Sequence, residues 1–374
     1  MAKEGKLSSN DIMKMINKKA GRQIAFSGDQ ENPADIKDWI PTGSRWLDSI
    51  VCRGQYAGIP VGRISEIAGL ESSGKSYMAG QIAREAQKKN IKILYFDSEA
   101  TMTSEFLEKL GCDMGKENEI IILQPDDVEQ CLETIELCMA NDPDNRYLFV
   151  WDSLAMTPCR ADHEKDFNPQ SSMAMKPRVL SLGMQKLITT LSKTQSTLLV
   201  LNQLKKNITS NVAEAFTTPY FTPGGKAIIY AYSLRVWLTG LKGKKSMIFD
   251  DKNYRIGTEL KAKLEKSKFG TQGRICNFKI LWAGEDLGIM DEESWLEAIK
   301  PSEALTNSGA WYTMKGHDKK FTGSQFVNLA KTDPSFREMI FKIMDEEVIR
   351  KFKTKEGDAK NFYDTEEDPK EEIG

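Results

Sequence analysis

A glycine-rich segment at residues 69–76, Gly-Leu-Glu-Ser-Ser-Gly-Lys-Ser, holds the residues whose types and spacing point most directly to chemistry. Its glycines let backbone N–H groups close around phosphate oxygens, and the spacing is typical of a phosphate-binding loop. The amine of Lys75 is then expected to reach the β- and γ-phosphates of a nucleotide, and the hydroxyl of Ser76 to bind Mg²⁺. The residues expected to contact the nucleotide here are Gly69, Glu71, Ser72, Ser73, Gly74, Lys75, Ser76 and Tyr77.

Two further apolar runs end in acidic residues that suit the same chemistry. Residues 147–152, Tyr-Leu-Phe-Val-Trp-Asp, predict a buried strand that delivers the Asp152 carboxylate to Mg²⁺. An aspartate that caps the next helix is the alternative. Residues 95–99, Tyr-Phe-Asp-Ser-Glu, place Glu99 after another apolar strand, where a carboxylate can polarise an attacking water. A glutamate on a surface loop is an equally open interpretation of Glu99.

A third apolar run, residues 197–201, ends in Asn202 and Gln203, and an amide at this place can sense nucleotide hydrolysis. Residues 204–222 then combine lysines, hydroxyl residues and aromatic rings, and lead into Pro-Gly-Gly-Lys at residues 223–226. A long loop of this kind is more often functional than accidental. Lysines together with aromatic rings suit contacts with the phosphates and bases of a nucleic acid.

The elements that must position these residues alternate between strands and helices. Strands are expected at five apolar segments, which are residues 63–68, 92–97, 120–123, 147–152 and 197–202. Alternation of this kind predicts a doubly wound α/β fold, a P-loop NTPase core with a mostly parallel twisted sheet flanked by helices. Residues 234–282 are rich in strand patterns and are expected to extend this sheet with antiparallel strands.

The pattern along the chain indicates four parts. Residues 1–35 are expected to form a small helix at residues 9–19, which serves oligomerisation, and a linker. Residues 36–284 form the ATPase core, residues 285–352 a small α+β module, and residues 353–374 an acidic tail. The residues expected to cap the first helix are Ser9, Asn10 or Asp11.

Charge narrows the ways in which the chain could bind nucleic acid. The 374 residues carry a net charge of −2, so DNA binding depends on local basic patches rather than on an overall basic surplus. The last 19 residues hold eight acidic side chains and two lysines, a composition typical of a disordered, solvated tail. The functional alternative is a tail that competes with DNA for basic surfaces.

The cysteine content and the hydropathy of the chain indicate where in the cell the protein acts. Six cysteines without a Cys-x-x-Cys pair, and only two histidines, argue against a zinc site and favour free, mostly buried thiols in a reducing compartment. The first 14 residues are polar, and no apolar run approaches the roughly 20 residues of a membrane span. We therefore expect a cytosolic protein without a membrane partner.

These motifs, in this order, resemble the RecA-type family of homologous recombinases. The similarity runs over about residues 42–348 and is closest at residues 64–76, Ile-Ser-Glu-Ile-Ala-Gly-Leu-Glu-Ser-Ser-Gly-Lys-Ser, and at residues 151–158. Asn202 and Gln203 match the amide switch of the family. Residues 308–312, Ser-Gly-Ala-Trp-Tyr, resemble a signature of its C-terminal module, which generic P-loop ATPases lack.

The resemblance implies roles for individual residues. Glu99 resembles the catalytic glutamate, Gln203 would contact the γ-phosphate, and Phe106 would pack on the adenine. Lys266 and Lys268 resemble a lysine pair that reaches the ATP of the adjacent subunit. Tyr230 would join the subunits. Residues 160–175 and 204–226 correspond to two DNA-binding loops, although for the first the residues alone leave a plain surface loop equally open. The expected DNA contacts are Arg178, Lys205, Lys206, Gly224, Gly225 and Lys226.

The function that the resemblance implies is that of a DNA-dependent ATPase, with ATP and Mg²⁺ as cofactors. It would form a helical filament on single-stranded DNA and pair that strand with homologous double-stranded DNA, aided by single-strand-binding and mediator proteins. Thr103 replaces an acidic residue that commonly reads adenine, and Gln185 replaces a basic residue of the first loop's helix. These departures fit a diverged, phage-encoded relative that acts in the bacterial cytosol of an infected host. The alternatives are a hexameric helicase-type motor and a non-catalytic recombination paralogue.

Overall fold

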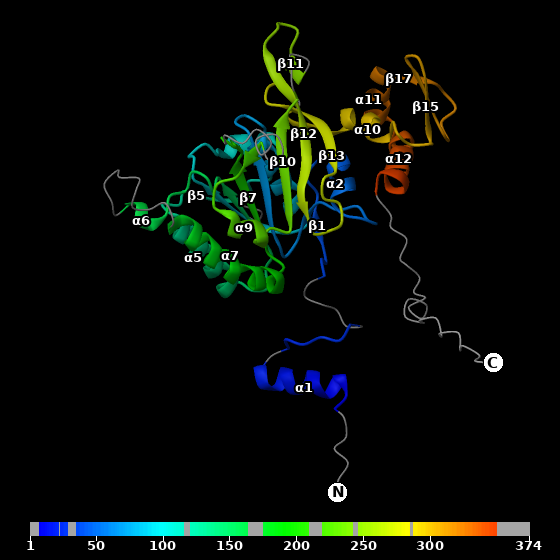
Figure 1. Cartoon of the computed structure of the whole chain (residues 1–374). Coiled ribbons are helices and arrows are strands. Elements are labelled where there is room, and N and C mark those ends of the chain that lie inside the picture. The colour runs from blue at the N-terminus through cyan, green and yellow to red at the C-terminus, as the bar shows by residue number, and fades with distance from the viewer. Residues whose placement is uncertain are drawn as a thin grey trace, which may run out of the picture.

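A computed structural model describes residues 7–21, 23–28, 35–115, 120–163, 175–208, 219–241, 246–284 and 287–349 (Figure 1). Parts of both expected DNA-binding loops, and the whole acidic tail, lie outside these residues.

The centre of the fold is a ten-stranded sheet in the order β14-β13-β12-β10-β3-β7-β6-β4-β5, with β11 paired to β12. Six of its strands run parallel: β3 (Ile64–Gly69), β4 (Lys92–Asp97), β5 (Ile120–Leu123), β6 (Tyr147–Asp152), β7 (Thr197–Gln203) and β10 (Leu234–Gly240). The other four extend it by antiparallel pairing: β11 (Met247–Phe249), β12 (Arg255–Ser267), β13 (Ile275–Leu281) and β14 (Gly288–Met290). The predicted α/β fold and its antiparallel extension are confirmed.

Helices cover both faces of this sheet. Along β6, Leu148 and Val150 face a core that includes α3 (Lys75–Gln87), whereas Phe149 and Trp151 face a second core. The second core contains α5 (Val128–Asn141), α7 (Met175–Thr194) and α9 (Lys226–Ala231), of which α5 and α7 lie side by side (Figure 1). Burial on both faces explains why the central strands have continuous apolar sequences.

Shorter elements connect the layers. They are β1 (Trp39–Ile40), α2 (Arg45–Val51), β2 (Ile59–Pro60), α4 (Ser104–Lys109), α6 (Arg160–His163), β8 (Lys205–Lys206) and β9 (Tyr220–Phe221). The six cysteines have free thiols, five of them buried, as expected. In the described part of the chain, no helix is long and apolar enough to cross a membrane.

The first helix, α1 (Ser9–Ala20), matches the predicted range but is capped differently. Its cap is Ser8, because Ser8 has extended backbone angles and its hydroxyl accepts the Asp11 N–H. The Asp11 carboxylate in turn accepts the Ser8 N–H, which completes a capping box. The prediction that residue 9, 10 or 11 caps the helix was therefore wrong. No residue of α1 is buried, and Ile12 and Met15 are exposed.

The C-terminal module combines helices with a small antiparallel sheet (Figure 1, orange). Its elements are α10 (Asp291–Ile299), β15 (Leu305–Ser308), β16 (Trp311–Met314), β17 (Phe321–Thr322), α11 (Gly323–Thr332), α12 (Pro334–Ile343) and the π-helical turn η3 (Met344–Val348). Phe326 and Phe336 join the same core as α3. Strand β14 lies beyond residue 284, the expected C-terminal boundary of the core, yet it pairs with β13 of the central sheet. The division of the chain at this point stays a prediction.

Candidate nucleotide site

A cavity of about 870 Å³ lies at the carboxyl edge of the parallel strands. It collects most of the residues that the sequence assigns to the nucleotide, and four that it does not, Leu70, Leu204, Arg255 and Trp282. The lining residues are Leu70, Glu71, Ser72, Ser73, Gly74, Lys75, Ser76, Tyr77, Glu99, Asp152, Gln203, Leu204, Arg255 and Trp282.

The phosphate-binding loop bends from the end of β3 into the first turn of α3. Gly74 has φ +73°, and a Cβ atom at this residue would lie 2.5 Å from Cδ1 of Ile280, so glycine suits both the backbone and the packing. The Lys75 amine donates a hydrogen bond to the carbonyl of Leu70 at 3.1 Å. Burial lowers the pKa of Lys75, and the nearby Asp152 and Glu99 carboxylates oppose that shift.

The Asp152 carboxylate is fixed by two hydroxyl groups. One oxygen accepts hydrogen bonds from Ser76 Oγ at 2.9 Å and from Tyr95 Oη at 2.7 Å. Burial raises the pKa of Asp152, while these two hydrogen bonds lower it. Residues 153–156 form turns, so within the described part of the chain Asp152 caps no helix, and that alternative is set aside. The Ser76 hydroxyl and the Asp152 carboxylate are oxygen ligands of the kind that Mg²⁺ prefers.

Glu99 reaches the cavity from a turn that another carboxylate stabilises. The Asp97 side chain accepts the backbone N–H of Glu99 at 3.3 Å and that of Met102 at 2.8 Å. Glu99 Oε1 accepts a hydrogen bond from Ser153 Oγ at 2.6 Å. The carboxylate is therefore held on the cavity wall, beside Lys75 and Asp152.

Gln203 ends β7, and its backbone N–H donates to the Asn202 side chain at 2.9 Å. The Asn202 amide donates both to Glu66 at 3.0 Å and to the carbonyl of Pro223 at 3.1 Å. It thus ties the nucleotide edge to the residue that precedes Gly224 at the end of the second expected DNA-binding loop.

Glu66 is part of a buried ion pair at the centre of the sheet. Its second carboxylate oxygen lies 2.6 Å from Nε of Arg235, and both side chains are almost fully buried. Nη2 of Arg235 donates to the Thr222 hydroxyl at 2.9 Å. These contacts bring together three segments of the chain, β3, β10 and the end of the second expected loop.

Phe106 lies behind the cavity lining rather than in it. Its ring packs edge-on against Tyr77, with centroids 4.9 Å apart and the planes at 79°. Tyr77 itself lines the cavity, so the structure brings Phe106 next to the site through one intervening ring.

The expected DNA contacts lie apart from this cavity. Lys205 and Lys206 form β8, directly after the end of β7, and both are exposed. Arg178 on α7 and Lys226 at the start of α9 are exposed as well. Gly224 and Gly225 both have positive φ, and a Cβ atom at Gly224 would lie 2.5 Å from Cδ1 of Ile228.

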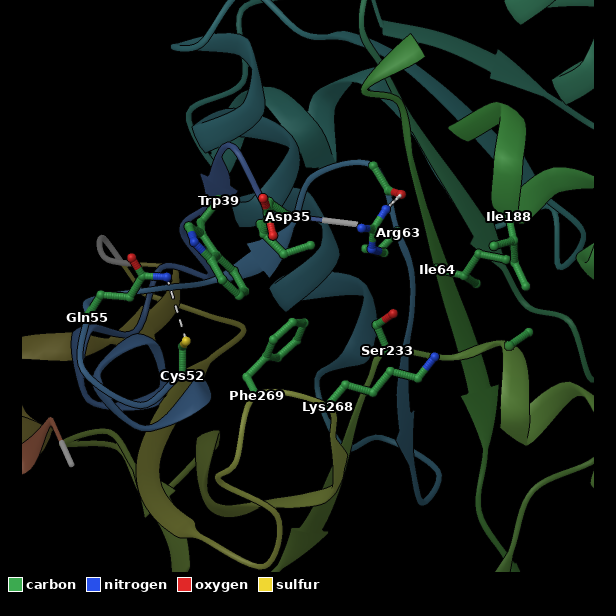
Figure 2. A pocket seen from close by; sticks show the side chains of 13 residues that line it. Asp35, Trp39, Cys52, Gln55, Arg63, Ile64, Ile188, Ser233, Lys268 and Phe269 are labelled. Carbon is green, nitrogen blue, oxygen red and sulfur yellow. Dashed lines mark hydrogen bonds between the residues drawn. The ribbon is translucent and has the colours of Figure 1, made fainter. Parts of the chain in front are cut away.

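The lysine pair lies at the opposite edge of the sheet. Ser267, between the two lysines, pairs with Leu234, which pairs with Ser65 near the start of β3, whereas the phosphate-binding loop follows the end of β3. Lys268 lines a second cavity of about 580 Å³ together with Trp39 and Phe269 (Figure 2). The pair therefore does not contribute to the nucleotide cavity of its own chain.

Lys266 is bound to the backbone of its own chain. Its amine donates to the carbonyl of Ile229 at 2.5 Å and to that of Tyr230 at 3.4 Å, at the C-terminal end of α9. Burial and, to a smaller extent, the positive charges of Lys268 and Arg235 together lower the pKa of Lys266 to about 8. The Tyr230 side chain is exposed beside it.

Sequence reasoning missed Arg255, Trp282 and Tyr95 as parts of the site. Strand β12 runs opposite to β3, and β13, which pairs antiparallel with β12, runs in the same direction as β3. The start of β12 and the end of β13 therefore lie at the same edge as the phosphate-binding loop. The sequence offers a weak signal for Trp282, an aromatic residue directly after an apolar strand. It offers none for Arg255.

Comparisons with known proteins place this geometry in context. Residues 8–287 match the family model described as RecA N-terminal domain. The chain is similar to "Protein RecA" of Streptomyces avermitilis, with 28% identity over 318 residues, 85% of this chain and 79% of the relative. It is 31% identical to "Protein RecA" of Clavibacter michiganensis over 296 residues, 79% of this chain and 75% of the relative. With "Protein RecA" of Fusobacterium nucleatum it shares 29% identity over 314 residues, 84% of this chain and 77% of that one.

Proposed function

Because the chain belongs to the RecA family, we propose that it is a DNA-dependent ATPase that assembles into a filament on single-stranded DNA. Membership of the family makes it a protein of DNA recombination and repair that acts by strand exchange. The specific activity, ATP hydrolysis to ADP and phosphate coupled to pairing of the bound strand with homologous duplex DNA, is our proposal.

The observation that carries the proposal is the convergence of Lys75, Ser76, Asp152 and Glu99 on one cavity. Backbone N–H groups at the start of α3 would hold the phosphates, and Lys75 would exchange its carbonyl partner for the β- and γ-phosphates. Ser76 and Asp152 would hold Mg²⁺, which when bound would neutralise charge on the phosphate oxygens. Glu99 would accept a proton from the attacking water.

A second copy of the chain would complete this site. Transition states of phosphoryl transfer need positive charge at the transferred group, and Lys266 and Lys268 lie at the far edge of their own sheet. An arrangement in which the lysine edge of one copy meets the nucleotide edge of the next would supply both cations. It would also repeat indefinitely, as a filament requires.

DNA contact would fall to the segments that follow β7 and precede α9. Exposed Lys205 and Lys206 suit phosphates, and base pairing itself would read the sequence. The hydrogen bond from Asn202 to the carbonyl of Pro223 offers a route by which Gln203, on sensing the γ-phosphate, could reorder this loop. Binding by single-strand-binding and mediator proteins, and a cytosolic location, stay predictions from the sequence.

The test is steady-state ATP hydrolysis with and without single-stranded DNA, for the wild type and for Glu99→Ala. We expect DNA to stimulate hydrolysis, and the variant to lose about 10²- to 10⁴-fold in rate while it still binds DNA when ATP is present. Glu105→Ala is the matched control, because Glu105 is an exposed glutamate that forms an ion pair with Lys109 in the same helix, α4.

Three outcomes would contradict the proposal. A rate of ATP hydrolysis that does not change when single-stranded DNA is added would favour a motor of another kind, such as the hexameric helicase. Absence of hydrolysis in the wild type, with DNA binding intact, would favour the non-catalytic paralogue. Equal losses in Glu99→Ala and Glu105→Ala would remove Glu99 from the chemistry.

A further inference from the structure

Arg255 and Trp282 form a clip at the rim of the nucleotide cavity. Arg255 begins β12 and pairs with Phe249 of β11, next to the turn of the hairpin that these two strands form (Figure 1). Trp282 directly follows β13. The Trp282 backbone N–H donates to the carbonyl of Ile256 at 2.9 Å, and its indole N–H donates to the carbonyl of Arg255 at 3.2 Å. The guanidinium carbon of Arg255 lies 5.0 Å from the centroid of the indole ring.

The Arg255 side chain has few other commitments. Within the described residues, the Arg255 guanidinium makes no ion pair with a carboxylate. Its one hydrogen bond among these residues, from Nε to the carbonyl of Gly257, is long at 3.4 Å. A cation over the face of an indole ring is attracted by the negative charge on that face. Among the described residues, the Trp282 ring is therefore the main neighbour of the guanidinium.

The position of Trp282 suits the base end of a bound nucleotide. The phosphates are expected at residues 72–76, and Ile280, two residues before Trp282, packs against Gly74 in that loop. Trp282 therefore lines the same cavity as the phosphate-binding loop. Its half-buried, flat aromatic ring faces that cavity. Nucleic-acid bases stack on such surfaces with little dependence on their identity.

We propose that Arg255 is a positioning residue for the nucleotide base, acting through Trp282, whose ring it holds in the orientation on which the base stacks. The inference rests on the proposed nucleotide site and adds to it a residue from outside the recognised motifs. Arg255 itself makes no contact with the phosphates in this arrangement. Removing the Arg255 side chain should therefore weaken the binding of ligands that carry a base, and should not weaken the binding of a bare polyphosphate.

The experiment measures the dissociation constants of ADP and of inorganic tripolyphosphate for the full chain without DNA, by titration calorimetry. We expect Arg255→Ala to weaken ADP binding about two- to fivefold and to leave tripolyphosphate binding unchanged. Trp282→Ala should weaken ADP binding more, on the order of tenfold. Arg255→Lys should recover part of the affinity, because the ammonium group keeps the charge but not the planar stacking.

A double-variant cycle and a charge control complete the test. Adding Arg255→Ala to Trp282→Ala should weaken ADP binding no further, since the arginine acts through the ring. Lys252→Ala removes the same charge from the exposed tip of the hairpin and should change neither constant. The folded state of each variant is checked by circular dichroism.

Several results would overturn the proposal. These are an unchanged ADP affinity in Arg255→Ala, an equal weakening of tripolyphosphate, which would indicate a phosphate contact, or additive losses in the double variant. Failure of the nucleotide site itself would look different. In that case the wild type would bind neither ligand, or Lys75→Ala would leave both affinities intact.

Discussion

At the carboxyl edge of the sheet, Ser76 and Tyr95 donate hydrogen bonds to Asp152, and Ser153 donates one to Glu99. At the amino edge, the described hydrogen bonds of the Lys266 amine go to the carbonyls at the end of α9, and Lys268 borders a cavity whose lining includes Trp39 and Phe269. The first edge has side chains that fix one another within a single chain. At the second edge, Lys266 and Lys268 have no carboxylate partner among the described residues. The contrast supports the proposal that one copy of the chain binds nucleotide and that two copies are needed to hydrolyse it.

The largest loss of hydrolysis is expected when one lysine at each edge of the sheet is replaced, each in a separate variant. Lys75→Ala should abolish nucleotide binding by the single chain, whereas Lys268→Ala should leave it within twofold of the wild type. Both variants should lose about 10³-fold in DNA-dependent hydrolysis, because each removes positive charge from the transition state. Binding is measured by calorimetry and hydrolysis by phosphate release.

Mixing these two variants gives the sharper test. In a mixed filament, some interfaces would pair the intact nucleotide site of a Lys268→Ala chain with the intact lysine edge of a Lys75→Ala chain. Random mixing should restore about a quarter of the wild-type rate. If the mixture stays as inactive as its components, the two edges do not act on the same nucleotide.

The second prediction concerns the residues that join the two edges. Glu66→Gln should reduce the free energy of unfolding by about 3 kcal/mol, because it leaves the buried guanidinium of Arg235 without a counter-charge. Urea denaturation followed by circular dichroism measures this loss. Glu105→Gln, which breaks an exposed pair with Lys109, should cost less than about 1 kcal/mol, and equal losses would contradict the argument from burial.

The third prediction uses the pKa of Lys266, which burial lowers to about 8. A lowered pKa means that the amine loses its proton as pH rises through 8, so its attraction for phosphate is present below that pH and fades above it. DNA-dependent hydrolysis should therefore fall by roughly three- to tenfold between pH 7 and pH 9. Lys266→Arg stays charged throughout and should show a flatter profile. Parallel profiles for the two proteins would exclude this lysine as the cause.

The smallest effect is expected for single phosphate contacts with DNA. Lys206→Ala should weaken binding of single-stranded DNA a few-fold and reduce the slope of log affinity against log salt by about 0.7. Lys193→Ala is the control, because Lys193 is exposed in the last turn of α7, at the amino edge of the sheet. Fluorescence anisotropy at several salt concentrations measures both, and equal slopes for the two variants would argue against a DNA contact at Lys206.

The parts of the fold that could be predicted are those that local pattern determines. The strands at residues 92–97 and 147–152 were placed correctly because burial on both faces requires unbroken apolar sequence. Residues 120–123 were also placed correctly, although β5 ends the sheet and Ile121 is exposed. The phosphate-binding loop was identifiable because its glycines and lysine are adjacent in the chain. The cap of α1 was misplaced by one to three residues because several neighbouring residues can all act as caps.

The parts that could not be predicted depend on the order of strands in the sheet. Arg255 and Trp282 reach the cavity because β12 pairs antiparallel with β10, and β13 pairs antiparallel with β12. No local sequence pattern specifies which strands are neighbours in the sheet. The same holds for Lys266, whose contact with the end of α9 follows from the pairing of β10 with β12. Its role at a neighbouring subunit could be expected only from family resemblance, and it stays a prediction.

The ion pair between Glu66 and Arg235 also constrains how this sequence can change over generations. The two residues are 169 positions apart in the chain, yet neither can be replaced alone without leaving a buried charge unmatched. Lineages descended from this sequence should therefore keep both residues or exchange both. A chimera built from two relatives, with its crossover between positions 66 and 235, should fold well only when both parents carry a matching pair.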